Sequence, residues 1–137
     1  MESTDAPPSL DLHREYVRTL LATRVAATVF IAFAAVWCHH QYVAQAGSVQ
    51  IFENMVTGGM EAMPKLTRLV TGNSGAILCG AIAATLAGLI FIWPLGRTMA
   101  RVIYGGTLAI SALLLTGIVY SIAYTEPLHT VITKFNG

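Results

Sequence analysis

Three long runs of apolar residues alternate with shorter polar segments along the chain. The runs cover residues 19–38, 76–95 and 102–124, and each is free of Asp, Glu and Lys. A helix needs roughly 20 apolar residues to cross the hydrocarbon core of a bilayer, and each run reaches that length. The pattern therefore predicts an all-α membrane protein with three transmembrane helices and the lipid bilayer as its first partner.

A shorter, helical pattern fills the segment between the first two runs, residues 46–75. Its apolar residues recur at spacings of three and four, which is typical of amphipathic helices. We predict two short helices, one over residues 48–57 that ends at a glycine pair, and one that begins at Pro64 and stops near residue 72. Such apolar faces must lie on the bilayer surface, on the ends of the spans or on a partner protein. The candidate contact residues of this segment are Phe52, Met55, Met63, Pro64, Leu66 and Thr67.

Small residues form a stripe along the second run, at every fourth position from Ala76 to Gly88. Small side chains allow two helices to approach closely inside a membrane, where dispersion contacts drive association. Both packing within the chain and self-association would use such a stripe, and the first is favoured because the other spans are nearby. The candidate contact residues here are Gly80, Ala84 and Gly88.

The positions of Lys and Arg predict the orientation in the membrane, because positively charged flanks stay in the cytoplasm. Five arginines flank the first and third runs on one side, and three basic residues lie on the other. Arg24 lies near one end of its run, so its guanidinium is expected to reach the lipid headgroups. We expect the bacterial inner membrane, with the N-terminus cytoplasmic and the C-terminus outside. The predicted segments are a cytoplasmic tail (1–18), the first transmembrane helix with its outer extension (19–45), a non-cytoplasmic loop (46–75), the second transmembrane helix (76–95), a cytoplasmic loop (96–101), the third transmembrane helix (102–124) and a non-cytoplasmic tail (125–137).

The sequence contains few residues suited to catalysis, metal binding or ion transport. A thiol and two imidazoles follow one another at Cys38, His39 and His40. Neighbouring side chains on a helix point about 100° apart, so this cluster is an unfavourable metal site. The three runs hold no carboxylate, the usual mark of a proton or ion pathway. We predict no enzyme activity, cofactor, metal or nucleic-acid partner, and we expect Cys38 and Cys79 to be free thiols.

The order of an apolar run, Phe52, a glycine pair, the sequence MPKLTRLV and a second apolar run resembles the type II secretion system F family. Members of that family are inner-membrane platform proteins of secretion and pilus machines, with a non-cytoplasmic pattern of Phe followed by Leu-Pro-x-x-Thr. Here Met63 stands in place of the Leu, followed by Pro64 and Thr67. The resemblance covers residues 25–95 and implies only the transmembrane hairpin, because the family's cytoplasmic helical domains have no counterpart.

Together these observations predict a small scaffold or accessory subunit that binds a membrane protein partner or a second copy of itself. The alternative is a small transporter or channel component. That alternative requires polar side chains to meet between the helices.

Overall fold

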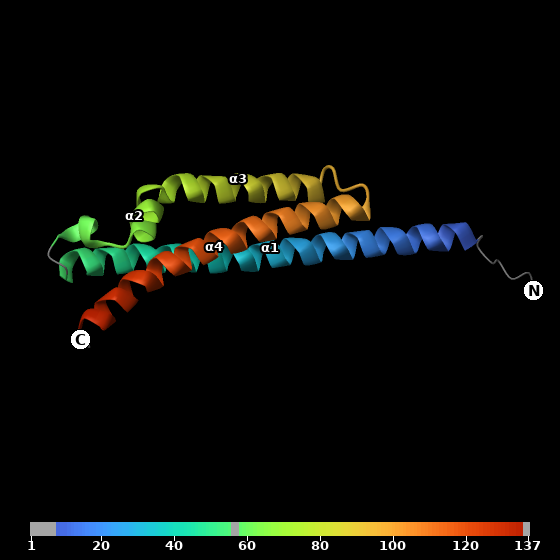
Figure 1. Ribbon diagram of the computed structural model, residues 1–137. Helices are drawn as coiled ribbons and strands as arrows, with labels where there is room; N and C mark the ends of the chain where they lie inside the picture. The colour runs from blue at the N-terminus through green and yellow to red at the C-terminus, as the bar shows by residue number, and fades with distance from the viewer. Residues whose placement is uncertain (1–7, 56–57, 136–137) are drawn as a thin grey trace, which may run out of the picture.

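The computed structural model describes residues 8–55 and 58–135, and these residues are almost entirely helical. Three of the helices are long and apolar enough to cross a membrane, and they run side by side (Figure 1). The predicted all-α fold with three transmembrane helices is confirmed. In chain order the elements are α1 (Pro8–Met55), the 3₁₀ turn η1 (Gly59–Ala62), α2 (Lys65–Gly72), α3 (Ser74–Ile92) and α4 (Met99–Phe135).

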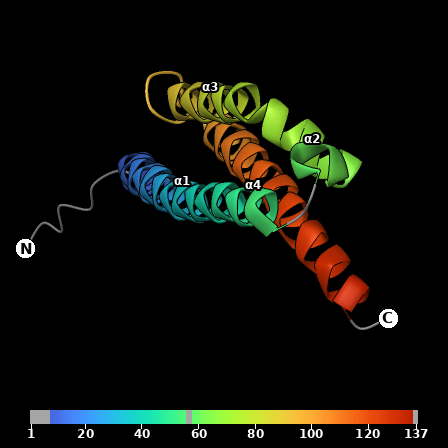
Figure 2. The same ribbon diagram turned by 90° about the vertical axis from the view of Figure 1, so that its left-hand side faces the viewer.

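Helix α4 lies between α1 and α3 and packs against both, whereas α1 and α3 barely touch each other (Figure 2). Glycines on α4 allow this close packing. Gly105 faces α3, where Gly88 approaches it, and Gly106 faces α1 at Ala27. Further along α4, the ring of Trp37 from α1 covers Gly117 so closely that a side chain there would overlap it. Small residues thus position α4 as the central helix.

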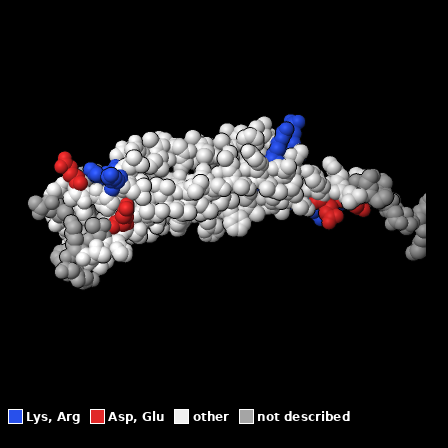
Figure 3. Space-filling view, viewed as in Figure 1, with Lys and Arg blue, Asp and Glu red and all other residues white. Residues whose placement is uncertain are grey.

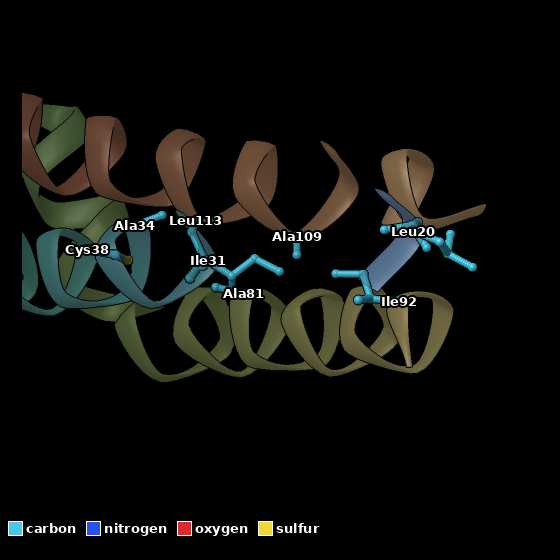
Figure 4. Packing of buried hydrophobic residues seen from close by; sticks show 9 residues of the cluster. Leu20, Ile31, Ala34, Cys38, Ala81, Ile92, Ala109 and Leu113 are labelled. Atoms are coloured by element: carbon cyan, nitrogen blue, oxygen red, sulfur yellow. The ribbon is translucent and has the colours of Figure 1, made fainter. Parts of the chain in front are cut away.

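The core follows this arrangement, since its residues come from all three spanning helices (Figure 4). Each helix contributes one stripe and leaves its remaining apolar surface exposed, as expected for helices surrounded by lipid. The buried cluster consists of Leu20, Ile31, Ala34, Cys38, Ala81, Ile92, Val102, Ala109 and Leu113.

The first predicted short helix, over residues 48–57, is not a separate element. Helix α1 instead continues without a break to Met55. No proline interrupts the chain between the two parts, and the single Gly47 costs a helix only about 1 kcal/mol. With 48 residues, α1 is about 72 Å long, more than twice the roughly 30 Å of a hydrocarbon core. It therefore projects well beyond the other helices at its N-terminal end (Figure 1).

The second predicted short helix is confirmed as α2, which begins directly after Pro64. It ends at Asn73, whose backbone N–H and side-chain amide both donate to the carbonyl of Leu69. Helix α3 starts at the next residue, so the chain turns sharply from α2 into the membrane-spanning direction (Figure 1).

Charged side chains gather at the two ends of the bundle and leave an uncharged band between them (Figure 3). Helix α3 has 19 residues and is therefore about 28 Å long, close to the thickness of a hydrocarbon core. The uncharged band is the part that a bilayer would cover. We call one end of the bundle the α2 end, and the other the loop end, after the α3–α4 connection at residues 93–98.

Candidate functional site at the α2 end

The α2 end is built around Pro127, a proline inside α4. Proline has no N–H, so the carbonyl of Ala123, four residues earlier, loses its helical hydrogen bond. The hydroxyl of Thr67 on α2 donates to that carbonyl over 3.2 Å. Thr67, Ala123 and Pro127 are all fully buried, where an unsatisfied carbonyl would be costly. Helix α2 therefore docks on α4 at the one carbonyl that the proline has released.

Further polar contacts join the helices here, and we call them the polar junction. Gln45 of α1 is buried and its amide Nε2 donates to Thr71 Oγ1 of α2 over 2.9 Å. Tyr120 of α4 donates its hydroxyl to the carbonyl of Ser74 over 3.0 Å. Its ring packs edge to face against Tyr42 of α1, with ring centroids 5.4 Å apart. The polar junction thus connects α1, α2, α4 and the start of α3.

Apolar contacts complete the docking of the segment between α1 and α3. Val49 and Phe52 of α1 form a buried cluster with Met63, two residues before α2 begins. On α2 itself, Val70 is buried against Tyr120 and Ala123 of α4. One face of the segment is therefore covered by the protein's own helices.

The opposite face of α2 is exposed. Leu69 lies on this face and keeps 63% of its surface accessible, and Leu66 lies at its edge with 38% accessible. At the end of α1, Ile51 and Met55 are also exposed, with 74% for Met55. A small apolar pocket of about 60 Å³ lies beside them. It is lined by Ser48, Ile51, Phe52, Met55, Pro127 and Leu128.

The candidate residues from the sequence divide into two groups by their position. The structure brings Phe52, Met63 and Thr67 together as buried residues of the α2 end, with Pro64 partly buried and Met55 and Leu66 exposed. The second group lies on α3, away from this end. There Gly88 is buried against α4, Ala84 is partly buried, and Gly80 is exposed with open space around it.

Sequence reasoning missed three residues that carry much of this site, namely Gln45, Tyr120 and Pro127. Pro127 lies just beyond the third apolar run, and a proline within a continuing helix indicates that some donor must satisfy the carbonyl four residues earlier. That requirement was readable from the sequence. Gln45 and Tyr120 gave no comparable signal, because their partners are far away in the chain.

Metal-binding chemistry is not apparent in the described ranges, 8–55 and 58–135, which contain no group of three His, Cys, Asp or Glu side chains suited to a metal ion. Cys38 is buried, whereas His39 and His40 are exposed, so the three side chains diverge as helix geometry predicts. Both Cys38 and Cys79 are free thiols, as expected.

Comparisons with models of known protein families, with curated proteins and with solved structures find no match to this chain. Its function must therefore be argued from its own residues. The α2 end has two features that bear on function. Buried hydrogen bonds join its helices, and apolar side chains on α1 and α2 are exposed.

Proposed function

We propose that this protein is a scaffold or accessory subunit of an inner-membrane assembly, related to the platform proteins of secretion and pilus machines. The proposal rests on the structure of the α2 end. There the Thr67–Ala123 hydrogen bond and the polar junction hold α2 in place, while Leu66 and Leu69 remain exposed. An apolar surface that is already ordered loses little conformational entropy when a partner binds.

The residues that carry the family resemblance support the proposal through their positions. Phe52 and Met63 share one buried cluster, and Thr67 makes the hydrogen bond that docks α2. Pro64 directly precedes α2 and is suited to the start of a helix. In this chain the pattern thus has a physical purpose, which is to fold the segment back onto its own helices and present the other face of α2.

We place the N-terminus in the cytoplasm and the α2 end outside. This orientation is supported by the charge bias, because Arg24, Arg97 and Arg101 lie at the loop end while Lys65 and Arg68 lie on α2. Basic residues are retained on the cytoplasmic side during insertion.

Cysteine labelling tests this orientation. In a chain with Cys38→Ala and Cys79→Ala, Glu61→Cys is expected to react with a membrane-impermeant maleimide on intact spheroplasts, because Glu61 is exposed at the α2 end. Thr98→Cys, exposed at the loop end, is expected to react only after permeabilisation. The reverse labelling pattern would contradict both the orientation and the relation to the family.

Partner binding through α2 is tested with the double substitution Leu66→Ala and Leu69→Ala. Burial of one leucine contributes roughly 1.5 to 3 kcal/mol, so recovery of a secretion or pilus platform component in mild detergent should fall more than about tenfold. The amount of protein in the membrane should not change, because neither side chain belongs to the buried residues of α2.

The matched control is Ile82→Ala with Leu86→Ala, which removes two exposed apolar side chains from the middle of α3. This control should retain its partner. If both variants recover as much partner as the unaltered chain, or if no such component is recovered with the unaltered chain, the scaffold proposal fails at this surface.

The polar junction favours a second candidate, a small transporter or channel component, because polar side chains do meet between the helices. Gln45, Thr71 and Tyr120 each have a hydrogen-bond partner within the chain, and a transported solute would have to replace these partners. Reconstitution into proteoliposomes separates the two functions. Solute flux that is lost in Gln45→Leu would support transport and weigh against the scaffold.

A further inference from the structure

The loop end carries an arginine that is held in one position. Arg24 of α1 donates a hydrogen bond from Nη2 to the carbonyl of Gly96 in the α3–α4 connection. Its guanidinium carbon lies 5.9 Å from the centre of the Trp93 ring, within the range of a cation–π contact. Trp93 in turn donates from its indole N–H to Thr28 Oγ1 over 3.2 Å. Arg24 is therefore fixed against the connection, at the end of the bundle towards which its guanidinium was expected to extend.

Two more arginines lie at the same connection. Arg97 belongs to it and is exposed, and its backbone N–H donates to the carbonyl of Leu95. Arg101, in the first turn of α4, donates from Nη1 to the same carbonyl over 3.4 Å. Figure 3 shows basic side chains standing out where α3 and α4 meet, with no acidic side chain beside them on that face.

The charge of these three arginines is not balanced by the protein. The groups they contact are neutral: the carbonyls of Leu95 and Gly96 and the ring of Trp93. Within the described part of the chain none of the three forms an ion pair with a carboxylate. Nε of Arg24 is also buried without a hydrogen-bond partner among these residues. A partly buried cation without a counter-charge is costly, and a nearby anion would remove much of that cost.

The other two arginines of this end differ in this respect. Arg14 and Arg18 each follow an acidic residue by three positions on α1, Asp11 and Glu15. Residues three apart on a helix are neighbours, so the charges there balance two against two. The excess positive charge is thus confined to the α3–α4 connection.

The depth of the connection indicates which anion is available. Helix α3 matches the thickness of the hydrocarbon core and ends at Ile92, so the residues that follow lie at the level of the lipid phosphates. Trp93 is 45% exposed beside them and is a residue type enriched at this interface. Arginine binds phosphate oxygens through two parallel N–H donors, which suits it to this ligand.

We propose that Arg24, Arg97 and Arg101 form a binding site for the phosphate group of an anionic phospholipid. Arg24 supplies a fixed positive charge at the inner edge of the site. Arg97 and Arg101 reach the phosphate from the connection and from α4. This site is independent of the surface at the α2 end and would tether the loop end to one class of lipid.

Trp93 provides a local reporter for the bound lipid. The chain has two tryptophans, so Trp37→Phe leaves Trp93 as the only one. The full chain is placed in phosphatidylcholine nanodiscs that contain a minor fraction of a lipid brominated near the glycerol. This brominated lipid is phosphatidylglycerol in one sample and phosphatidylcholine in the other, and quenching of Trp93 fluorescence by the bromine reports how much of it lies beside Trp93. Each basic residue near a membrane surface favours an anionic lipid by about fivefold, so local enrichment of phosphatidylglycerol at Trp93 should reach at least that factor. Equal quenching by the two brominated lipids would overturn the proposal.

Paired substitutions separate a defined site from the general charge of this end. Arg97→Gln with Arg101→Gln should reduce the enrichment at least about fivefold, whereas Arg14→Gln with Arg18→Gln removes the same charge and should leave it unchanged. An equal loss in both pairs would show a non-specific charge effect and overturn the site. Excess inorganic phosphate should have no effect. Competition by it would assign the arginines to a free anion and overturn the lipid as ligand.

Discussion

Gly88→Ala is expected to separate α3 from α4 and to destabilise the bundle. A Cβ atom at this position would lie 2.6 Å from the Cβ of Ala109 and 2.6 Å from the carbonyl oxygen of Gly105. The carbonyl oxygen is a backbone atom and the Cβ is attached directly to the backbone, so neither can rotate away. Overpacking of this kind costs about 1 to 3 kcal/mol, and the cost here should be at the upper end. Thermal unfolding in detergent, followed by circular dichroism, measures it.

Gly80→Ala is the matched control, because the same substitution is made on the same helix two turns away. No atom lies within 4 Å of the Cβ that it would add. Stability should stay the same or rise slightly, since alanine favours a helix by about 1 kcal/mol over glycine. If both substitutions lower the unfolding temperature equally, the close contact at Gly88 does not hold α3 on α4.

This contrast shows why the sequence could suggest helix packing without locating it. Every fourth residue from Ala76 to Gly88 is small, yet only the Gly88 end of that stripe reaches α4. Helix α3 is apolar on all sides, and lipid accepts the face that a neighbouring helix does not cover. The face that packs is decided by Gly105 and Ala109 on another helix, and no local pattern contains that information.

The number of spanning helices was predictable because hydropathy alone determines it. The second run, residues 76–95, differs from α3 by only two or three residues at each end. Helices α1 and α4 extend much further than their apolar runs, since polar residues continue a helix as readily as apolar ones do when no helix breaker intervenes. Hydropathy marks the part of a helix inside the membrane, and it does not mark where the helix ends.

Residues that act through distant partners could be predicted only in part. The apolar spacing and Pro64 predicted α2, and the structure adds that Thr67 bonds to a carbonyl 56 residues away. Arg24 was expected to reach the headgroups from the end of its run, but its contact with Gly96 depends on how the α3–α4 connection folds over α1. In both cases the residue type gave the chemistry and the tertiary fold supplied the partner.

Thr67→Val is expected to lower stability by about 1 to 3 kcal/mol, because it keeps the shape of the side chain but removes its donor. The carbonyl of Ala123 would then be buried without a partner, since Pro127 cannot supply an N–H. Thr67→Ser should retain most of the stability by keeping the hydroxyl. Thr116→Val is the control, because the Thr116 hydroxyl only bonds the carbonyl of Ala112 in its own helix over 2.8 Å. Thermal unfolding of the three variants measures the difference.

Pro127→Ala provides the decisive background for this prediction. Alanine restores an N–H that reaches the carbonyl of Ala123 within α4, so the Thr67 hydroxyl is no longer its only donor. In this background Thr67→Val should cost about 1 kcal/mol less than in the unaltered chain, and the two substitutions should be coupled by that amount. Purely additive effects of the two substitutions on stability would mean that the hydrogen bond to the Ala123 carbonyl does not hold α2 in place. The docking of α2 would then rest on its apolar contacts with Tyr120 and Ala123 and on the Gln45–Thr71 hydrogen bond.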